Sequence, residues 1–301
     1  MRGIQAILPL GSNMLRIRRP LLVAFLGILL PAAAHAQDGE TGTAPATDGF
    51  DTEHIFGFAE GSDIGPRGSW EIESFTVGSF GAASGNFNIG NDTSARSTVT
   101  DELRLSVGTL TDYDHLRGVP GLPGHGAAEF GGITAEARWN ILNRRTSPFG
   151  MSLSIDPEWH RADAASARQD GNYGVTTALL IDKEVIPETF FAALNLIHSA
   201  SFLPFDGKWE HDDAFSVIVS GAYAITPDLV VGAEIIHENL AQNGGLNAHA
   251  LFVGPQLFLR LNKDLTASMA WAVQIPDAAA RQLDVVNFER HQLGLRFAYD
   301  F

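Results

Sequence analysis

The chain has 301 residues, of which 45% are hydrophobic, and it contains 31 glycines and no cysteine. This composition excludes a chain of many long apolar helices and a small disulfide-stabilised scaffold. Residues 1–36 hold four arginines and no acid, so their removal changes the net charge from −15 to −19. A chain this acidic repels phosphate backbones, which argues against nucleic-acid binding.

The N-terminal region has the three parts of a secretory signal peptide. Arg16, Arg18 and Arg19 precede ten apolar residues (21–30), and Ala34-His35-Ala36 fits the small-x-small cleavage pattern. We predict cleavage before Gln37, although a chain begun at Met14 would carry a more typical signal. Ten apolar residues span only about 15 Å as a helix, against about 30 Å of hydrocarbon, which disfavours a membrane anchor.

Residues 37–67 form a leader between the signal peptide and the first strand. Residues 37–50 are rich in Gly, Thr, Asp and Ala, which is typical of disorder. His54 to Gly65 contains Ile55, Phe56, Phe58 and Ile64. We expect this stretch either to plug the periplasmic mouth of a barrel or to lie as a linker against its rim.

From Gly68 to the last residue, apolar and polar side chains alternate. In 133–141, Ile133 and Trp139 share one face, while Glu136 and Arg138 lie on the other. Alternation with period two indicates β-strands. After Ala36 no run of about 18 apolar residues follows, so a membrane-spanning mature chain must be a closed barrel.

The alternation predicts twelve strands over residues 68–301, at 68–80, 86–97, 102–112, 129–142, 149–159, 172–182, 189–202, 214–225, 229–240, 249–261, 265–275 and 288–301. Short connections alternate with longer ones at 113–128, 160–171, 203–213, 241–248 and 276–287, and only the loop near 81–85 departs from this pattern. An even strand count with short periplasmic turns and longer outer loops is typical of a bacterial outer-membrane barrel. The second strand is the weakest prediction, because its apolar face fades after Phe87 and Ile89.

The last strand resembles the C-terminal signal that outer-membrane barrels present to the barrel insertion machinery. Its apolar face consists of Leu293, Leu295, Phe297, Tyr299 and Phe301. A soluble β-sandwich would explain this alternation alone, but not its combination with twelve strands, a signal peptide and no cysteine. In a barrel the apolar face meets outer-membrane lipid and lipopolysaccharide. Aromatic side chains suited to the membrane interfaces are Trp139, Phe149, Tyr173, Phe202, Phe215, Tyr223, Trp271, Tyr299 and Phe301.

Several stretches resemble a family of uncharacterised proteobacterial outer-membrane, porin-like proteins. They are EHIFGFAEGSDIG (53–65), WEIES (70–74), SPFGMSLSIDPEWHR (147–161), FFAALNL (190–196), HALFVGPQLF (249–258) and NFERHQLGLRF (287–297). The resemblance covers most of the chain from Glu53 onward. It implies the barrel and a Gram-negative outer-membrane location, and it implies no substrate.

The polar face of the strands supplies candidate lumen-lining residues. They are Glu136, Arg138, Asp156, Asp182, Glu234, Gln256, Arg260, Gln274, Arg296 and Asp300. Acids and arginines occur together, which fits either a conduit for small polar solutes or an internal salt-bridge network that fills a narrow barrel. The negative charge favours cations if a pore exists. A structural or adhesive barrel acting through its outer loops is the alternative.

An outer-membrane lipid hydrolase is a third hypothesis, from a different class. His198 lies near Ser199 and Ser201, but both serines are on the opposite face and position 200 is alanine, so the His-x-Ser spacing of such enzymes is absent. We therefore expect no enzyme, no catalytic residue and no cofactor. Glu210, His211, Asp212 and Asp213 form an acidic cluster in a predicted loop, where solvation is a simpler expectation than metal binding.

Overall fold

A computed structural model describes residues 52–83, 85, 87–116, 125–161, 171–205, 208–242, 245–276 and 281–301. The predicted signal peptide and residues 37–51 of the leader lie outside the described residues. No helix in the described ranges is long and apolar enough to cross a membrane.

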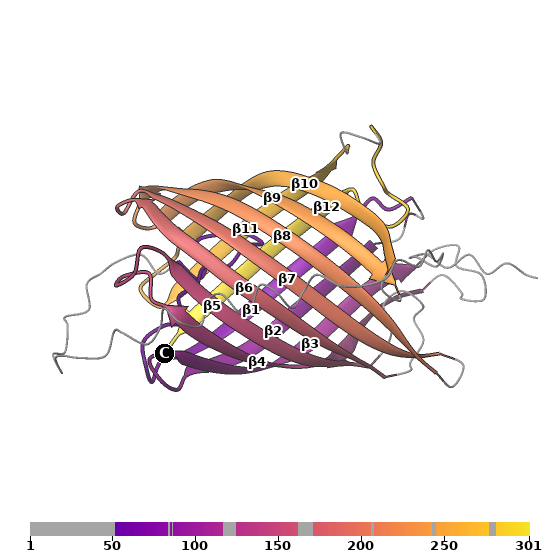
Figure 1. The fold of residues 1–301 in the computed structure, drawn as a ribbon, viewed down its shortest axis with the longest axis horizontal. Helices are drawn as coiled ribbons and strands as arrows, with labels where there is room; N and C mark the ends of the chain where they lie inside the picture. The colour runs from indigo at the N-terminus through magenta and orange to yellow at the C-terminus, as the bar shows by residue number, and fades with distance from the viewer. Residues whose placement is uncertain are drawn as a thin grey trace, which may run out of the picture.

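Twelve antiparallel strands form one closed barrel, which confirms the predicted fold class and strand count (Figure 1). The strands are β1 Trp70–Phe80, β2 Phe87–Thr98, β3 Leu103–Leu116, β4 His125–Leu142, β5 Gly150–His160, β6 Asn172–Ile186, β7 Phe190–Phe205, β8 Lys208–Thr226, β9 Leu229–Gln242, β10 Gly245–Arg260, β11 Leu265–Ile275 and β12 His291–Asp300. Each pairs with its sequence neighbours, and β12 closes the sheet on β1 from Phe80↔His291 to Glu71↔Asp300. Closure leaves no free strand edge.

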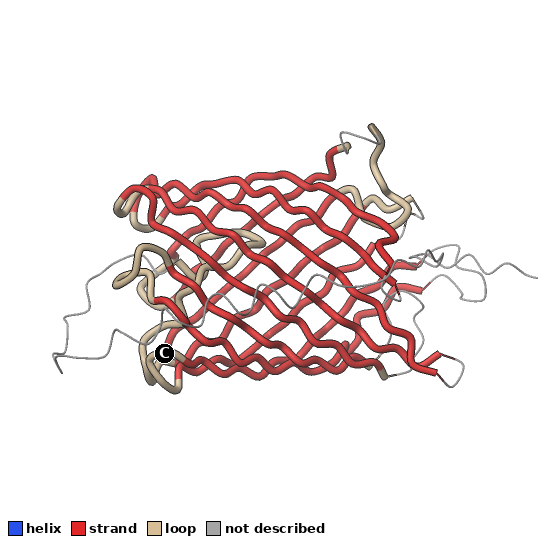
Figure 2. Tube along the Cα trace, in the orientation of Figure 1, coloured by secondary structure: helices blue, strands red, loops and turns tan. Residues whose placement is uncertain are grey.

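The two ends of the barrel differ in their connections. The C-terminus and the tight turns, such as 227–228 and 261–264, lie at one end (left in Figures 1 and 2). The strand ends that the other connections join lie at the opposite end, such as His160 of β5 and Asn172 of β6, or Ile275 of β11 and His291 of β12. We refer to these as the short-turn end and the long-loop end.

Two of the predicted long loops are instead strand. β7 extends to Phe205 and β8 begins at Lys208. β9 extends to Gln242 and β10 begins at Gly245. The acidic cluster at 210–213 therefore belongs to β8 and not to a loop. The sequence reading ended these strands where apolar alternation stopped, but backbone pairing requires no apolar face and continues beyond it.

The outer surface of the barrel is apolar. All nine aromatic side chains assigned to the membrane interfaces are exposed, from Phe149 and Phe215 at 37% to Phe301 at 74%. Large aliphatic residues such as Ile133, Ile155 and Ile235 are also about half exposed. An apolar exterior of this extent around a closed sheet is that of a barrel surrounded by lipid.

Residues 52–65 fold back inside the barrel from the short-turn end (Figure 2). Phe56 is fully buried and Ile55 is 1% exposed. The start and end of the segment are held together, because Thr52 donates from its backbone N–H to the Asp63 carboxylate (3.1 Å) and Gly61 donates to the Glu53 carbonyl (3.3 Å). We call residues 52–65 the inward-folded segment.

Candidate functional site in the barrel interior

The tip of the inward-folded segment is held by one carboxylate on β9. The backbone N–H groups of Gly57, Phe58 and Ala59 all donate to Glu234, at 3.2, 2.7 and 2.9 Å. Gly57 also donates to Oε1 of Gln256 on β10 (2.6 Å). A Cβ at position 57 would lie 2.4 Å from Cβ of Ala270, so this close approach requires glycine.

Acidic side chains of the segment pair with arginines of the barrel wall. Glu53 accepts hydrogen bonds from Arg96 on β2 (3.0 Å) and from Arg104 on β3. Burial alone would raise the pKa of Glu53, but Arg104, His54, Arg138 and Arg96 together hold it well below its usual range. Glu53 therefore remains ionised and ties the segment to this wall.

Glu60 joins the segment to the opposite sides of the barrel. Its carboxylate pairs with Arg138 on β4 and with Arg296 on β12 (3.2 Å). Its backbone N–H donates to Oδ1 of Asn195 on β7 (2.7 Å), and Asn195 donates back to the Glu60 carbonyl (2.9 Å). Burial opposes the negative charge, yet the arginines hold the pKa of Glu60 well below its usual value.

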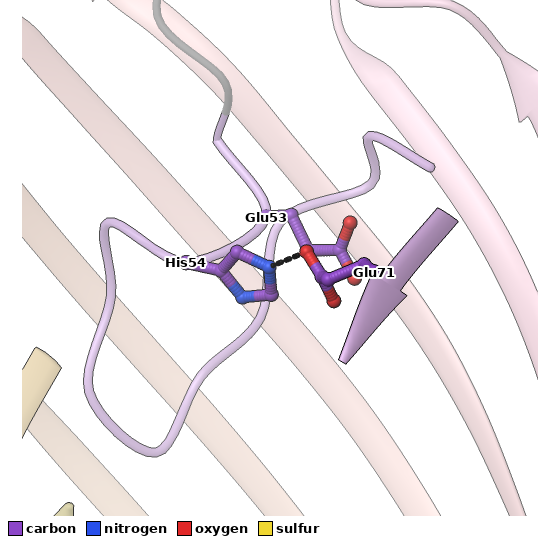
Figure 3. A group of neighbouring side chains, drawn as sticks. All are labelled: Glu53, His54 and Glu71. Carbon is purple, nitrogen blue, oxygen red and sulfur yellow. Dashed lines mark hydrogen bonds and ion pairs between the residues drawn. The ribbon is translucent and has the colours of Figure 1, made fainter. Parts of the chain in front are cut away.

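His54 completes the ion network, and Figure 3 shows it beside Glu53 and Glu71. Its Nε2 lies 2.7 Å from Oε2 of Glu71 and its Nδ1 lies 3.3 Å from Oε2 of Glu73. Burial alone would lower the pKa of His54, but Glu71, Glu53 and Glu73 raise it to about 9. The imidazole is therefore charged at neutral pH, with a hydrogen bond from Nε2 to Glu71 and an ion pair between Nδ1 and Glu73.

Glu53, His54 and Glu71 also place three potential metal-ligand atoms within 4.8 Å of one another. Arg96 and Arg104 already donate to Glu53, so a bound cation would lie beside two guanidinium groups. A protonated His54 balances the surrounding carboxylates without a metal. The arrangement therefore fits an ion-pair network better than a metal centre.

The end of the segment is fixed by a second polar group. Ser62 donates its backbone N–H to Asp182 on β6 (3.1 Å), and its carbonyl accepts from Asn140 on β4 (2.8 Å). Arg144, in the turn after β4, reaches both Asp63 (2.9 Å) and Asp182 (3.3 Å). The segment is thus bonded around most of the barrel circumference.

The interior wall formed by β7 to β11 carries most of the buried apolar side chains, with Glu234 and Gln256 among them, whereas the arginines Arg96, Arg104 and Arg138 lie on β2 to β4. Phe56 and Ile55 of the segment belong to the same buried apolar cluster as this wall, whose members include Phe191, Ile218, Val230, Ile236, Phe252 and Phe258. Phe288, from the connection before β12, joins the cluster near the long-loop end. The segment therefore places acids against one wall and apolar side chains against the other.

A cavity of about 220 Å³ lies between the segment and the charged wall. Phe58 and Glu60 line one side, and the remaining lining comes from β1 to β7. Six carboxylates but only two guanidinium groups face it: Glu60, Glu73, Asp92, Glu136, Asp156 and Glu158, with Arg96 and Arg138. Asp156 bonds to Ser154 (3.1 Å), and Asp92 has only a long contact to Thr134 (3.4 Å). Neither has an arginine partner in the described part of the chain, so carboxyl groups outnumber guanidinium groups on the cavity lining.

Eight of the ten lumen-lining candidates lie inside the barrel wall. Glu136, Arg138 and Asp156 face the cavity, while the other five surround the inward-folded segment or the apolar cluster: Asp182, Glu234, Gln256, Gln274 and Arg296. Arg260 and Asp300 occupy the last inward positions at the short-turn end. Asp300 is exposed, and Arg260 pairs with Asp228 in the neighbouring turn (3.7 Å). These two residues belong to the mouth of the barrel.

Several interior residues escaped the sequence analysis. Asp92 and Arg96 alternate with outward residues on β2, and Arg104 does so on β3. Their spacing of two residues could have indicated that they face the barrel interior. The outward face of β2 is also polar, however, so the sequence did not distinguish the inward face of this strand from the outward one. The partners Glu53, His54 and Glu60 carried no such signal, because they precede the strands.

The rim histidine has an acid partner that the sequence analysis did not find. His198 faces outward on β7, where its ring stacks on Phe215 (4.5 Å between centroids) and its Nε2 lies 2.8 Å from Oδ1 of Asp213. Ser199 points inward, 2.9 Å from Thr176. The histidine and acid thus lack a serine on their own face, which does not favour lipid hydrolysis.

The chain belongs to a family of unknown function, DUF6662, whose model matches residues 48–301. No curated protein sequence matches it. Among solved structures, it is similar to the COG4313 outer membrane channel from Pseudomonas putida F1, with 14% identity, a TM-score of 0.53, and coverage of 80% of this chain and 98% of that chain. At this identity the likeness establishes the barrel fold alone.

Two porins are similar at lower scores. The NanC porin is 8% identical over 76% of this chain and 98% of its own, and the KdgM porin is 10% identical over 77% and 99%, each with a TM-score of 0.45.

Proposed function

We propose that this protein is an outer-membrane channel for small polar solutes, with a preference for cations, whose short-turn end is narrowed by residues 52–65. The observation that carries the proposal is the excess of carboxyl over guanidinium groups on the cavity lining, where Asp92 and Asp156 form no ion pair with an arginine of the described residues. An ion network built only to fill the lumen would pair these acids. Clefts lined by charge of one sign concentrate the opposite ion.

Apolar side chains on the cavity lining refine the class of solute. Because Phe58, Phe75 and Leu180 line the cavity together with the carboxyl groups, it suits solutes that carry a positive group and a small hydrocarbon part. We also propose that the short-turn end faces the periplasm and that export uses the predicted cleaved signal peptide. This orientation agrees with the short periplasmic turns of bacterial outer-membrane barrels.

Single-channel recording in a planar bilayer with a KCl gradient tests the proposal. We expect openings with a cation-selective reversal potential for the unmodified protein. The double variant Asp92→Asn, Asp156→Asn should move the reversal potential toward zero. The matched control is Asp101→Asn with Glu102→Gln, which removes two exposed charges from a tight turn at the short-turn end and should change selectivity little.

A sealed barrel that acts through its outer loops is the second candidate, favoured by the number of bonds that hold the inward-folded segment. The variant Glu234→Ala separates the two functions, because it removes the acceptor for three N–H groups of the segment tip. If neither this variant nor the unmodified protein conducts, the channel proposal is wrong and the sealed barrel stands.

A further inference from the structure

The outer face of β1, β2 and β3 carries six polar side chains at the middle of the strands. They form two rows across the three strands: Ser74, Thr93 and Thr109 in one row, and Thr76, Asn91 and Thr111 in the other. We call these six residues the β1–β3 polar patch. It explains why the apolar face of β2 fades in the sequence.

The alternation of each strand shows that this patch faces outward. On β1, Ile72 is 45% exposed and in phase with Ser74, whereas Glu73 is buried. On β3, Leu105 and Val107 are exposed and in phase with Thr109, whereas Arg104 is buried. Members of the interior ion network therefore occupy the opposite face of the same three strands: Glu73 on β1, Arg96 on β2 and Arg104 on β3.

Apolar side chains border the patch on both sides. Ser74 and Thr76 are paired with Phe297 and Leu295 on β12, and Thr109 and Thr111 are paired with Ile133 and Phe130 on β4. All four neighbours are exposed. Near the middle of other strands the outer face carries exposed apolar side chains, with the polar Thr177 on β6: Ile155, Leu196, Val219, Ile235 and Met269. The patch is thus a polar island in an apolar belt.

Lipid tails cannot satisfy this patch. Asn91 donates from Nδ2 to Ser74 Oγ and to Thr76 Oγ1 (both 2.9 Å), and Thr93 donates to Asn91 Oδ1 (2.9 Å). Among the described residues, Thr109 and Thr111 form no side-chain hydrogen bond. A hydroxyl group that faces hydrocarbon without a hydrogen-bond partner has an unfavourable free energy. A polar surface at the same depth in the membrane would provide the missing partners.

We propose that a second copy of this chain covers the β1–β3 polar patch, so that two barrels associate through β1 to β3. Hydroxyl and carboxamide groups both donate and accept, which makes the patch complementary to itself under a two-fold axis. Short side chains also allow the two sheets to approach closely. Lipopolysaccharide head groups do not fit, because they lie beyond the outer ends of the strands and not at their middle.

Aromatic rings border the patch toward the long-loop end and could pack in the same interface. Phe80 stacks on Phe87, which stacks in turn on His115, at centroid distances of 5.8 and 4.8 Å.

The strand pairing under the patch disfavours a lateral exit for solutes through this wall. β2 pairs without a break with β1, from Trp70↔Ser97 to Ser79↔Asn88, and with β3, from Phe87↔His115 to Thr98↔Arg104. The interface would therefore join two intact barrels.

Cysteine cross-linking in membranes tests the proposal directly, since the chain has no native cysteine. The full-length protein with Thr93→Cys should form a disulfide-linked homodimer under mild oxidation. The control Val219→Cys, which is 49% exposed on the outer face of β8, should remain monomeric. Equal cross-linking of both variants, or a Thr93→Cys adduct with a different protein, would overturn the second copy as the occupant.

A second variant tests the polar contacts without a new thiol. Asn91→Leu with Thr109→Val and Thr111→Val keeps the side-chain volumes similar but removes three polar groups. In sedimentation equilibrium in detergent we expect the dimer dissociation constant to rise at least tenfold, while single-channel conductance per barrel is unchanged. An unmodified protein that is monomeric at every concentration would also overturn the proposal, and it would leave the channel function untouched.

Discussion

Nε2 of His54 lies 2.7 Å from Oε2 of Glu71, which joins the inward-folded segment to the first strand of the barrel. With His54 protonated, the surrounding network has equal numbers of both charges: Glu53, Glu60, Glu71, Glu73 and Glu136 against His54, Arg96, Arg104, Arg138 and Arg296. His54 is the member of this set whose charge changes at moderately alkaline pH.

We therefore predict that the inward-folded segment loosens in alkaline solution. Docking raises the pKa of His54 from 6.5 to about 9, so its stabilising effect is complete below pH 6.5 and is lost as pH rises through about 9. Ala59→Cys, at a fully buried position of the segment, should react with a methanethiosulfonate reagent increasingly between pH 8 and 10. Rates are normalised to Val286→Cys, which is 70% exposed, to correct for thiol ionisation. A His54→Gln background should abolish the normalised increase, and its persistence there would show that another group controls docking.

Replacement of Glu234 should release the tip of the segment. Glu234→Ala leaves the N–H groups of Gly57, Phe58 and Ala59 without their charged acceptor. Since hydrogen bonds to charged groups contribute about 1.5–3 kcal/mol each and are not additive, we expect docking to weaken by about 3 kcal/mol. Labelling of Ala59→Cys at neutral pH measures the change.

The matched control is Glu238→Ala. Glu238 is four residues further along β9 on the same inward face, and its carboxylate accepts from Gln292 and not from the segment. It should leave labelling near the unmodified rate. Equal labelling of both variants would mean that a general loosening of β9 is responsible.

The wall of the barrel was predictable from sequence, whereas its contents were not. Alternation assigned inward and outward faces on strands such as β4, β11 and β12, because a period of two is a local property, but it did not do so on β2, where both faces are polar. The pairing of Glu60 with Arg296 joins residues 236 apart and depends on barrel closure, which no local pattern encodes. The acid partner of His198 was missed for a related reason: Asp213 reaches it only through the β7–β8 register.

The buried arginines should matter far more to stability than those at the mouth. Arg138→Ala leaves the carboxylates of Glu60 and Glu136 without a shared partner inside the barrel. Breaking a buried pair costs about 3–5 kcal/mol, because an uncompensated charge remains. Arg260→Ala, at a partly exposed position beside Asp228, should cost at most about 1 kcal/mol. Equilibrium unfolding in urea, with the barrel refolded in lipid vesicles, compares the two, and similar values would show that solvent reaches the Arg138 network freely.

The terminal aromatic residue should affect assembly and not stability. Phe301 is 74% exposed, so its side chain has little packing to lose, although its backbone N–H donates to the Trp70 carbonyl (2.9 Å) and helps to close the barrel. If the outward face of β12 is the signal read by the insertion machinery, Phe301→Ser should lower the amount of assembled barrel in cells several-fold. Refolding of the purified variant into detergent should remain unchanged, because the backbone bond is retained. Val286→Ser, which removes a similarly exposed apolar side chain from the connection before β12, is the control and should assemble normally. Loss of refolding in detergent by Phe301→Ser would instead assign the residue a structural role at the β1–β12 seam.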